Sequence, residues 1–315
     1  MKKAILITVM LSMLIPCRLV AYDGGLGSGL ETGFLYLQRS DNLSTGSDAR
    51  IGSLGEEAET ESSIVPVVLF NMSAGLGGGR GVYLKSDTGE GEELGLSLGT
   101  VIPLGERENI LDLSVIYVPF QEAWKNPYQT GSSRQETDVT KYGGKAALGA
   151  IAGTPLGVSF KVASVDVEDD EIGKLDKSLA RDGIIYEASA DYRMDVTRDF
   201  SVIPSLTYER GDFDGASNSY DGYGAALLLM YRSPPFLMVP VFAYSFDQYD
   251  ESHPLFGKKR EDSRFAMFLT AQISGLFGSP ALYLKVITGY VSTDSNIDFC
   301  DSDGTFAGMT VGYRF

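Results

Sequence analysis

The only histidine of the chain, His253, is the first candidate for chemistry. Three carboxylates lie close to it in sequence: Asp247, Asp250 and Glu251. A histidine beside a carboxylate is part of a hydrolase triad, but the triad also needs a nucleophile held against the ring. The segment around His253 is long, polar and glycine-containing, which favours a solvated loop. The sequence therefore predicts no catalytic residue, no enzyme, no metal and no cofactor.

Two acidic runs, residues 166–171 and 294–303, suggest calcium binding. Calcium prefers carboxylate oxygens, but an EF-hand needs glycine where the second run has Phe299, and glutamate where it has Thr305. We therefore favour solvated loops that bridge to lipopolysaccharide through divalent cations. The glycine-rich segment 75–81 similarly suggests a phosphate-binding loop. It lacks the following Lys-Ser/Thr and helix, so a tight turn is the better interpretation.

A set of ionisable residues shares one face of several alternating segments. Its members are Lys141, Lys145, Lys161, Glu187, Asp191, Arg193, Glu209, Lys285 and Arg314. If that face lines an enclosed interior, charged and small side chains indicate a water-filled pore. The alternative is an interior in which these charges only satisfy one another. Leu228 and Met230 lie on the same face and argue against a uniformly wet interior.

The elements that position these residues are strands, because apolar and polar residues alternate with period two along the whole chain. We expect fourteen strands, at residues 29–39, 64–74, 79–86, 93–103, 109–120, 139–152, 155–166, 183–195, 199–210, 219–232, 235–246, 264–275, 280–292 and 305–315. The weak segment 79–86 leaves twelve as an alternative. Tight turns alternate with long acidic links at 40–63, 121–138, 167–182 and 247–263. This asymmetry predicts an all-β, antiparallel up-and-down transmembrane barrel with both termini in the periplasm.

Closure of the sheet follows from the cost of unpaired backbone groups in hydrocarbon, which is several kcal/mol each. The last strand must then pair with the first. Tyr313 and Phe315 lie on the lipid face of that last strand. They resemble the terminal signature of outer-membrane proteins, which implies recognition by the barrel-insertion machinery.

The N-terminus predicts the compartment. Lys2 and Lys3 precede an apolar run over residues 4–16, which is typical of a signal peptide and too short for a spanning helix. We expect cleavage after Ala21, so residues 1–21 are the signal and residues 22–315 the outer-membrane barrel. Removing Lys2, Lys3 and Arg18 changes the net charge from -16 to -19, and such an acidic chain repels nucleic acid.

The segment from Trp124 through Pro127 and Tyr128 to Arg134 and Thr137 carries a recognisable signature, W-x-[DN]-P-[YF] followed by R-x-x-T. It resembles a family of bacterial outer-membrane proteins that carries a domain of unknown function, and the similarity continues through residues 153–173 and 182–183. The resemblance implies a porin-like barrel and no particular activity. Trp124, Pro127, Tyr128 and Arg134 suit a loop that folds back onto the barrel mouth, where Arg134 pairs with an acidic loop.

Three functions are compatible with such a barrel. The leading prediction is a porin-like passive channel for small solutes. The second is a facilitator of hydrophobic compound uptake, which needs an apolar internal surface. The third is a structural or adhesive barrel that acts through its acidic loops. In each case the partners are outer-membrane lipid and lipopolysaccharide.

Overall fold

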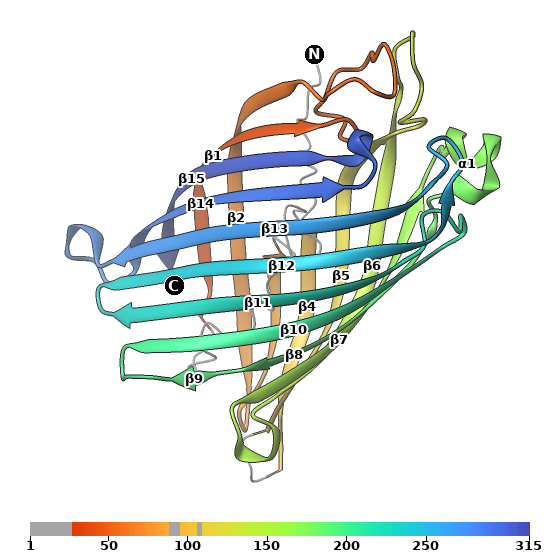
Figure 1. Ribbon diagram of the computed structural model, residues 1–315. Helices are drawn as coiled ribbons and strands as arrows, with labels where there is room; N and C mark the ends of the chain where they lie inside the picture. Colours follow the sequence, from red (N-terminus) through yellow and green to blue (C-terminus); the bar gives the residue numbers. More distant parts are fainter. Residues whose placement is uncertain (1–26, 88–94, 106–108) are drawn as a thin grey trace.

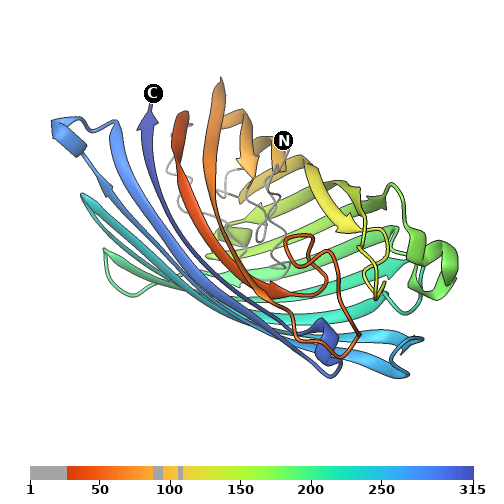
Figure 2. The ribbon, with the colours of Figure 1, turned by 90° about the horizontal axis from the view of Figure 1, so that it is seen from above.

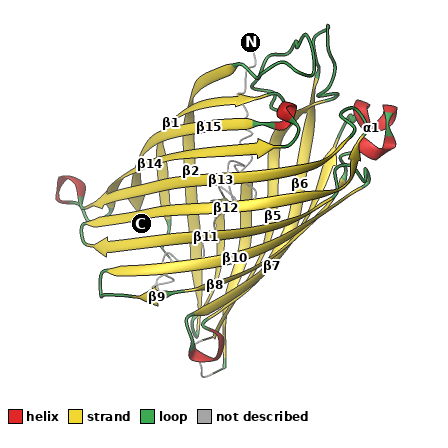
Figure 3. Cartoon of the chain, in the orientation of Figure 1, coloured by secondary structure: helices red, strands yellow, loops and turns green. Residues whose placement is uncertain are grey.

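The computed structural model describes residues 27–87, 95–105 and 109–315. Its strands are β1 (Gly29–Asp41), β2 (Thr60–Gly77), β3 (Arg80–Asp87), β4 (Gly95–Leu104), β5 (Asn109–Trp124), β6 (Glu136–Gly149), β7 (Leu156–Val167), β8 (Gly183–Tyr192), β9 (Met194–Asp195), β10 (Phe200–Phe213), β11 (Tyr220–Ser233), β12 (Phe236–His253), β13 (Lys258–Ser274), β14 (Leu282–Ser295) and β15 (Ser302–Arg314). Among the described residues, one short helix, α1 (Glu171–Leu175), and four 3-10 turns lie at strand ends, outside the sheet (Figure 3). None of the described helices is both long and apolar enough to cross a membrane.

All the strands belong to one closed antiparallel sheet, in which each strand pairs with the next along the chain, except that β8 and β9 both pair with β10. The ring closes where β1 pairs with β15, from Gly29 opposite Arg314 to Asp41 opposite Ser302. Figures 1 and 2 show these two strands side by side in a continuous wall. Strands β8 and β9 follow one another along β10 and together count as one strand of the barrel wall. The fifteen strands therefore form fourteen barrel strands, which we call staves. The predicted all-β, fourteen-strand barrel is confirmed, and twelve strands is wrong.

The two faces of the sheet carry different side chains, because successive residues of a strand point to opposite sides. On β15, the outward residues Met309, Val311 and Tyr313 are 57%, 45% and 50% exposed. Similar exposed apolar side chains occur on the outer face of the other staves. Exposure of such an apolar surface to water would be strongly unfavourable, whereas its contact with the hydrocarbon of a membrane is favourable. The closed sheet leaves no unpaired edge, so the barrel is suited to cross a membrane.

The two ends of the barrel differ in their connections. At one end, the short-turn end, brief turns connect strands such as β2 and β3, where Gly77, Gly78 and Gly79 all have positive φ. This is the predicted tight turn. At the other end, the long-loop end, the connections include residues 42–59, 125–135 and 168–182.

The predicted long loop 247–263 is wrong. Residues 247–253 continue β12 and residues 258–263 belong to β13, so only residues 254–257 form the turn. The sequence predicts strands that are too short because the polar composition of residues 247–263 favours a loop. The polar residues there instead alternate with period two on a hairpin that extends the wall at the long-loop end.

Candidate functional site: the covered long-loop end and the inner wall

The anchor residues predicted from the sequence hold two loops together at the long-loop end. Arg134 is 3% exposed, and its guanidinium donates to the carbonyl oxygens of Asn42 (2.6 Å) and Pro127 (3.1 Å). It also donates to the carbonyl of Asp48 and lies 4.4 Å from the Trp124 ring centroid. The indole of Trp124, itself 2% exposed, donates to the Ser44 carbonyl at 2.9 Å. Loop 42–59 is therefore fixed to loop 125–135 by buried side chains.

Loop 125–135 also reaches across the opening of the barrel. The Tyr128 hydroxyl lies 2.9 Å from Nε2 of His253 at the end of β12, and the ring centroids are 4.9 Å apart. By the shorter way round the sheet, β7, β8, β10 and β11 separate β6 from β12. Strands lie about 4.8 Å apart, so this arc is roughly 24 Å along the wall. A direct contact over that separation requires the loop to pass over the barrel mouth.

An apolar cluster joins four connections over the mouth. The Tyr128 ring lies 5.9 Å from Phe256, in the β12–β13 turn, and 5.5 Å from Phe299, in the β14–β15 connection. Ile51, from loop 42–59, is 5% exposed and belongs to the same cluster. We call the assembly of residues 42–59, 125–135, 254–257 and 296–301 the loop cover. Since its contacts come from widely separated staves, the loop cover lies over the long-loop end of the interior.

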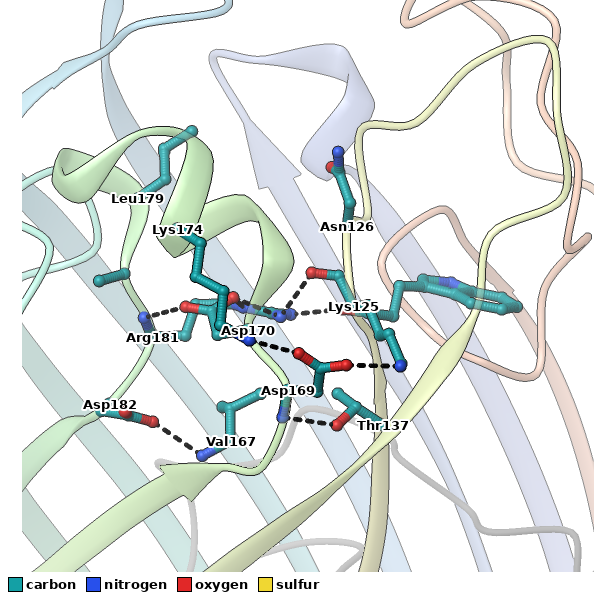
Figure 4. Close-up of polar contacts among 12 residues, drawn as sticks. Lys125, Asn126, Thr137, Val167, Asp169, Asp170, Lys174, Leu179, Arg181 and Asp182 are labelled. Carbon is teal, nitrogen blue, oxygen red and sulfur yellow. Dashed lines mark hydrogen bonds and ion pairs between the residues drawn. The ribbon is translucent and has the colours of Figure 1, made fainter.

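A network of ion pairs fastens loop 168–182 beside the loop cover (Figure 4). Arg181 donates to Asp170 at 2.8 Å and to the Trp124 carbonyl at 2.8 Å. The Lys125 ammonium donates to Asp169 at 2.5 Å, and Lys174 pairs with the other oxygen of that carboxylate. The hydrogen bond from Lys125 lowers the pKa of Asp169 to about 2. Two carboxylates of the acidic run 166–171, those of Asp169 and Asp170, thus form ion pairs within the protein, contrary to the prediction of a solvated loop.

His253 also differs from its prediction as a solvated residue. It is 2% exposed and packs against Tyr128 and Phe256. Its Nδ1 accepts a hydrogen bond from the Leu255 backbone at 3.3 Å, so both ring nitrogens are engaged. Among the described residues, no cluster of three or more histidine, cysteine, aspartate or glutamate side chains has the arrangement of a metal site. From the end of β12, the histidine therefore packs against the loop cover.

Eight of the nine ionisable residues predicted to line the interior lie on the inner register of their strands, and Arg193 lies between β8 and β9. Lys161 pairs with Glu187 at 2.6 Å, and Lys285 pairs with Glu31 at 2.5 Å. Glu209 accepts a hydrogen bond from Tyr220 and is 1% exposed. These four predicted residues, Lys161, Glu187, Lys285 and Glu209, are therefore ion-paired or hydrogen-bonded within the wall, as the self-paired alternative predicted.

The other predicted inner residues occupy two regions. Lys141 and Lys145 of β6 and Asp191 of β8 lie on the inward register, between outward neighbours. The remaining two lie near the short-turn end. There Arg193 donates to Asp195 at 2.7 Å, and the Arg314 guanidinium lies 4.6 Å from the Tyr283 ring centroid.

A second charged group on the inner wall was missed by the sequence analysis. Arg264 pairs with Asp247 at 2.7 Å, and Arg260 pairs with Asp262 at 2.6 Å. Both carboxylates are fully buried. The signal is present as period-two spacing of Arg260, Asp262 and Arg264, but the sequence prediction places Arg260 and Asp262 in the loop 247–263 and begins the strand only at Arg264. These residues lie between the loop cover and the middle of the wall.

Below the charged group, toward the short-turn end, the inner wall of β10–β14 is apolar. Its buried side chains form one cluster, which includes Ile203, Leu228, Met230, Val239, Val241, Phe268 and Val291. Phe268 stacks on Phe306 of β15 with ring centroids 5.7 Å apart. The inward Leu228 and Met230 noted in the sequence belong to this cluster. The interior is therefore polar and ion-paired on one level and apolar on the next.

The predicted assembly residues lie on the outside at the short-turn end. Phe315 is 69% exposed, and its ring centroid lies 6.4 Å from that of Tyr313. The Phe315 amide donates to the carbonyl of Ser28, just before β1. These aromatic rings are positioned to contact lipid, while the backbone of the last residues completes the closure with the first strand.

A closed antiparallel sheet, apolar outside and carrying ionisable side chains inside, defines a transmembrane β-barrel of the bacterial outer membrane. Residues 25–314 match the family described as protein of unknown function (DUF2860), and the chain belongs to that family. The family resemblance predicted from the sequence is thereby confirmed. No curated protein matches the chain.

Several solved outer-membrane structures are similar at low sequence identity. A FadL homologue of Pseudomonas aeruginosa has 12% identity and a TM-score of 0.49, over 91% of this chain and 90% of that chain. An outer membrane channel from Pseudomonas putida F1 has 12% identity and a TM-score of 0.49, over 95% and 100%. The outer membrane channel DcaP of Acinetobacter baumannii has 12% identity and a TM-score of 0.45, over 92% and 98%.

Proposed function

We propose that this protein is a porin-like outer-membrane channel for small solutes, in which the loop cover controls access at the long-loop end. The observation that carries the proposal is the contact of Tyr128 with His253 and Phe299 over the mouth of a closed barrel. A barrel whose only role is structural does not need a loop that spans its opening. The orientation with both termini in the periplasm, supported by the short and long connections, makes the loop cover extracellular.

Planar bilayer recording of the purified full chain tests this function. We expect discrete ohmic steps from the wild-type protein. Tyr128→Ala should enlarge or prolong them, because it removes the ring that joins the four connections. The matched control is Tyr142→Ala, since Tyr142 is 55% exposed on the outer face of β6. Absence of steps from both the wild type and Tyr128→Ala would overturn the channel proposal.

The apolar wall favours a second candidate function, the facilitated uptake of hydrophobic compounds. A charged interior alone would give such compounds no favourable surface, whereas the cluster around Leu228, Val241 and Phe268 does. Liposomes that contain the barrel should then take up a labelled hydrophobic solute faster than liposomes that contain the Leu228→Asp variant. Equal rates would exclude this route.

A further inference from the structure

One row of inner residues combines a guanidinium with two hydroxyl groups that have no partner. Ser245 on β12 lies opposite Arg264 on β13, which in turn lies opposite Thr293 on β14. All three residues are at most 3% exposed. Within the described part of the chain, neither Ser245 Oγ nor Thr293 Oγ1 has a hydrogen-bond partner. A buried hydroxyl without a partner is unfavourable because it has lost its hydrogen bonds to water, so two such hydroxyls beside one guanidinium need an explanation.

The neighbouring row toward the short-turn end consists of small side chains on β11, β12 and β13 and of Val291 on β14. Ala226, Ala243 and Ala266 lie opposite one another on β11, β12 and β13. Beyond them the same strands carry Leu228 and Val241, with Phe268 next to Val241. On β11, β12 and β13 the polar row is therefore separated from the apolar wall only by methyl groups, which project least from the sheet, and on β14 the apolar Val291 is the next inward residue after Thr293. A molecule that lies along the strands would meet hydroxyls first and apolar side chains next.

Two ion pairs lie beside the polar row, and the buried carboxylate of Glu209 on β10, which accepts a hydrogen bond from Tyr220, interacts with them. Arg264 pairs with Asp247 at 2.7 Å and lies 3.9 Å from Asp262, which pairs with Arg260. Two guanidinium groups thus face two carboxylates. An anionic head group would be repelled by the carboxylates, and a cationic head group would be repelled by the guanidinium groups. An uncharged hydroxyl or carbonyl group avoids both repulsions.

We propose that the inner face of β11–β14 binds an uncharged amphiphile. Its hydroxyl or carbonyl head lies over Arg264 between Ser245 and Thr293, and its apolar body lies against Leu228, Val241 and Phe268. This inference rests on the proposed channel function, because the ligand reaches the site through the interior. The proposal assigns a substrate class to the apolar wall, whereas the burial of its side chains alone does not identify a ligand.

The test uses the purified full chain in lipid nanodiscs and saturation-transfer NMR titrations. The probes are benzyl alcohol, benzoate and benzylammonium, which share a ring and differ in head-group charge, and empty nanodiscs give the lipid background. We expect benzyl alcohol to bind at least tenfold more tightly than either ion. Equal binding of benzoate, or no binding of benzyl alcohol above the empty nanodiscs, would overturn the proposal.

The variant Ser245→Ala/Thr293→Val removes both hydroxyls at nearly constant shape. Because these groups lack partners in the described chain, the variant should fold as well as the wild type while its affinity for benzyl alcohol falls about tenfold. The matched control, Ser189→Ala, removes a buried inner hydroxyl that lies 2.6 Å from Ser159 Oγ, and it should bind as the wild type does. Unchanged affinity in the double variant would show that only water occupies the row. If the variant does not fold, the head-group preference of the wild type decides the matter alone.

Bilayer recordings on the same preparation separate this inference from the channel proposal. Conductance steps without binding of benzyl alcohol would refute the amphiphile site and leave the channel intact. Binding without conductance steps would refute the channel and leave the binding face established.

Discussion

Replacing Arg134 with alanine should release the loop cover while leaving the barrel wall intact. The guanidinium donates to three backbone carbonyls, those of Asn42, Asp48 and Pro127, and also lies over the Trp124 ring. These carbonyls belong to the two loops that Arg134 joins. No strand of the sheet depends on these bonds, so the effect should be confined to the long-loop end.

The magnitude follows from the contacts. Hydrogen bonds from a charged donor contribute about 1.5–3 kcal/mol each, and a partly desolvated cation–π contact adds about 1 kcal/mol. Burial of the charge opposes this gain, and it lowers the pKa of Arg134 to about 10. Because the bonds share one side chain they are not additive. We expect a net loss of about 3 kcal/mol in the free energy of local opening, or roughly a 100-fold change.

Hydrogen exchange measured by mass spectrometry provides the assay. In Arg134→Ala, amides of residues 42–59 and 125–135 should exchange on the order of 100-fold faster, and those of the strands should not change. The matched control is Arg198→Ala, because Arg198 is exposed in a turn at the short-turn end. Unchanged exchange in both loops, or an equal increase throughout the sheet, would refute the proposed role of Arg134.

Three further results are expected. Glu31→Gln weakens the closure between β1 and β14–β15, because Lys285 and Tyr283 lose a carboxylate that they contact at 2.6 and 2.8 Å, and the folded band on a semi-native gel should unfold several degrees lower. The folded pKa of Asp169 is depressed to about 2, so its pairing with Lys125 stabilises loop 168–182 above about pH 4 and is lost as pH falls toward 2, which exchange measured across that range will show. Deletion of Phe315 should reduce the fraction of protein inserted by the barrel-insertion machinery, and normal insertion would remove its assigned role.

The barrel could be predicted because each strand is recognisable from the alternation of apolar and polar residues within its own segment. Each stave places apolar residues on lipid and polar or small residues inside, so period two persists in the sequence, as along Leu111–Tyr117. The fourteen staves and the pairing of the last with the first follow from that pattern and from the cost of an open edge. The aromatic residues Tyr313 and Phe315 also lie on the outer face as the alternation requires.

The loop cover could be predicted only in part, because its contacts join segments that are far apart in the sequence. The anchor residues Trp124 and Arg134 were visible as a motif, but their partners in loop 42–59 were not. His253 and Tyr128 lie 125 residues apart, and nothing local to His253 signals that it is buried. Similarly, Arg260 and Asp262 carry charges that favour a loop by composition, although their spacing fits a strand whose inner face is ion-paired.

Closure of the sheet between its first and last strands is the central claim, and a disulfide across that seam tests it most directly. In a Cys300→Ser background, Gln38→Cys and Thr305→Cys lie opposite one another on β1 and β15, where Cβ atoms are about 4.5–5.5 Å apart. The reference pair, Tyr290→Cys with Thr305→Cys, joins β14 and β15. We expect both pairs to form disulfides under mild oxidation. Formation of the reference disulfide alone would contradict the closed barrel.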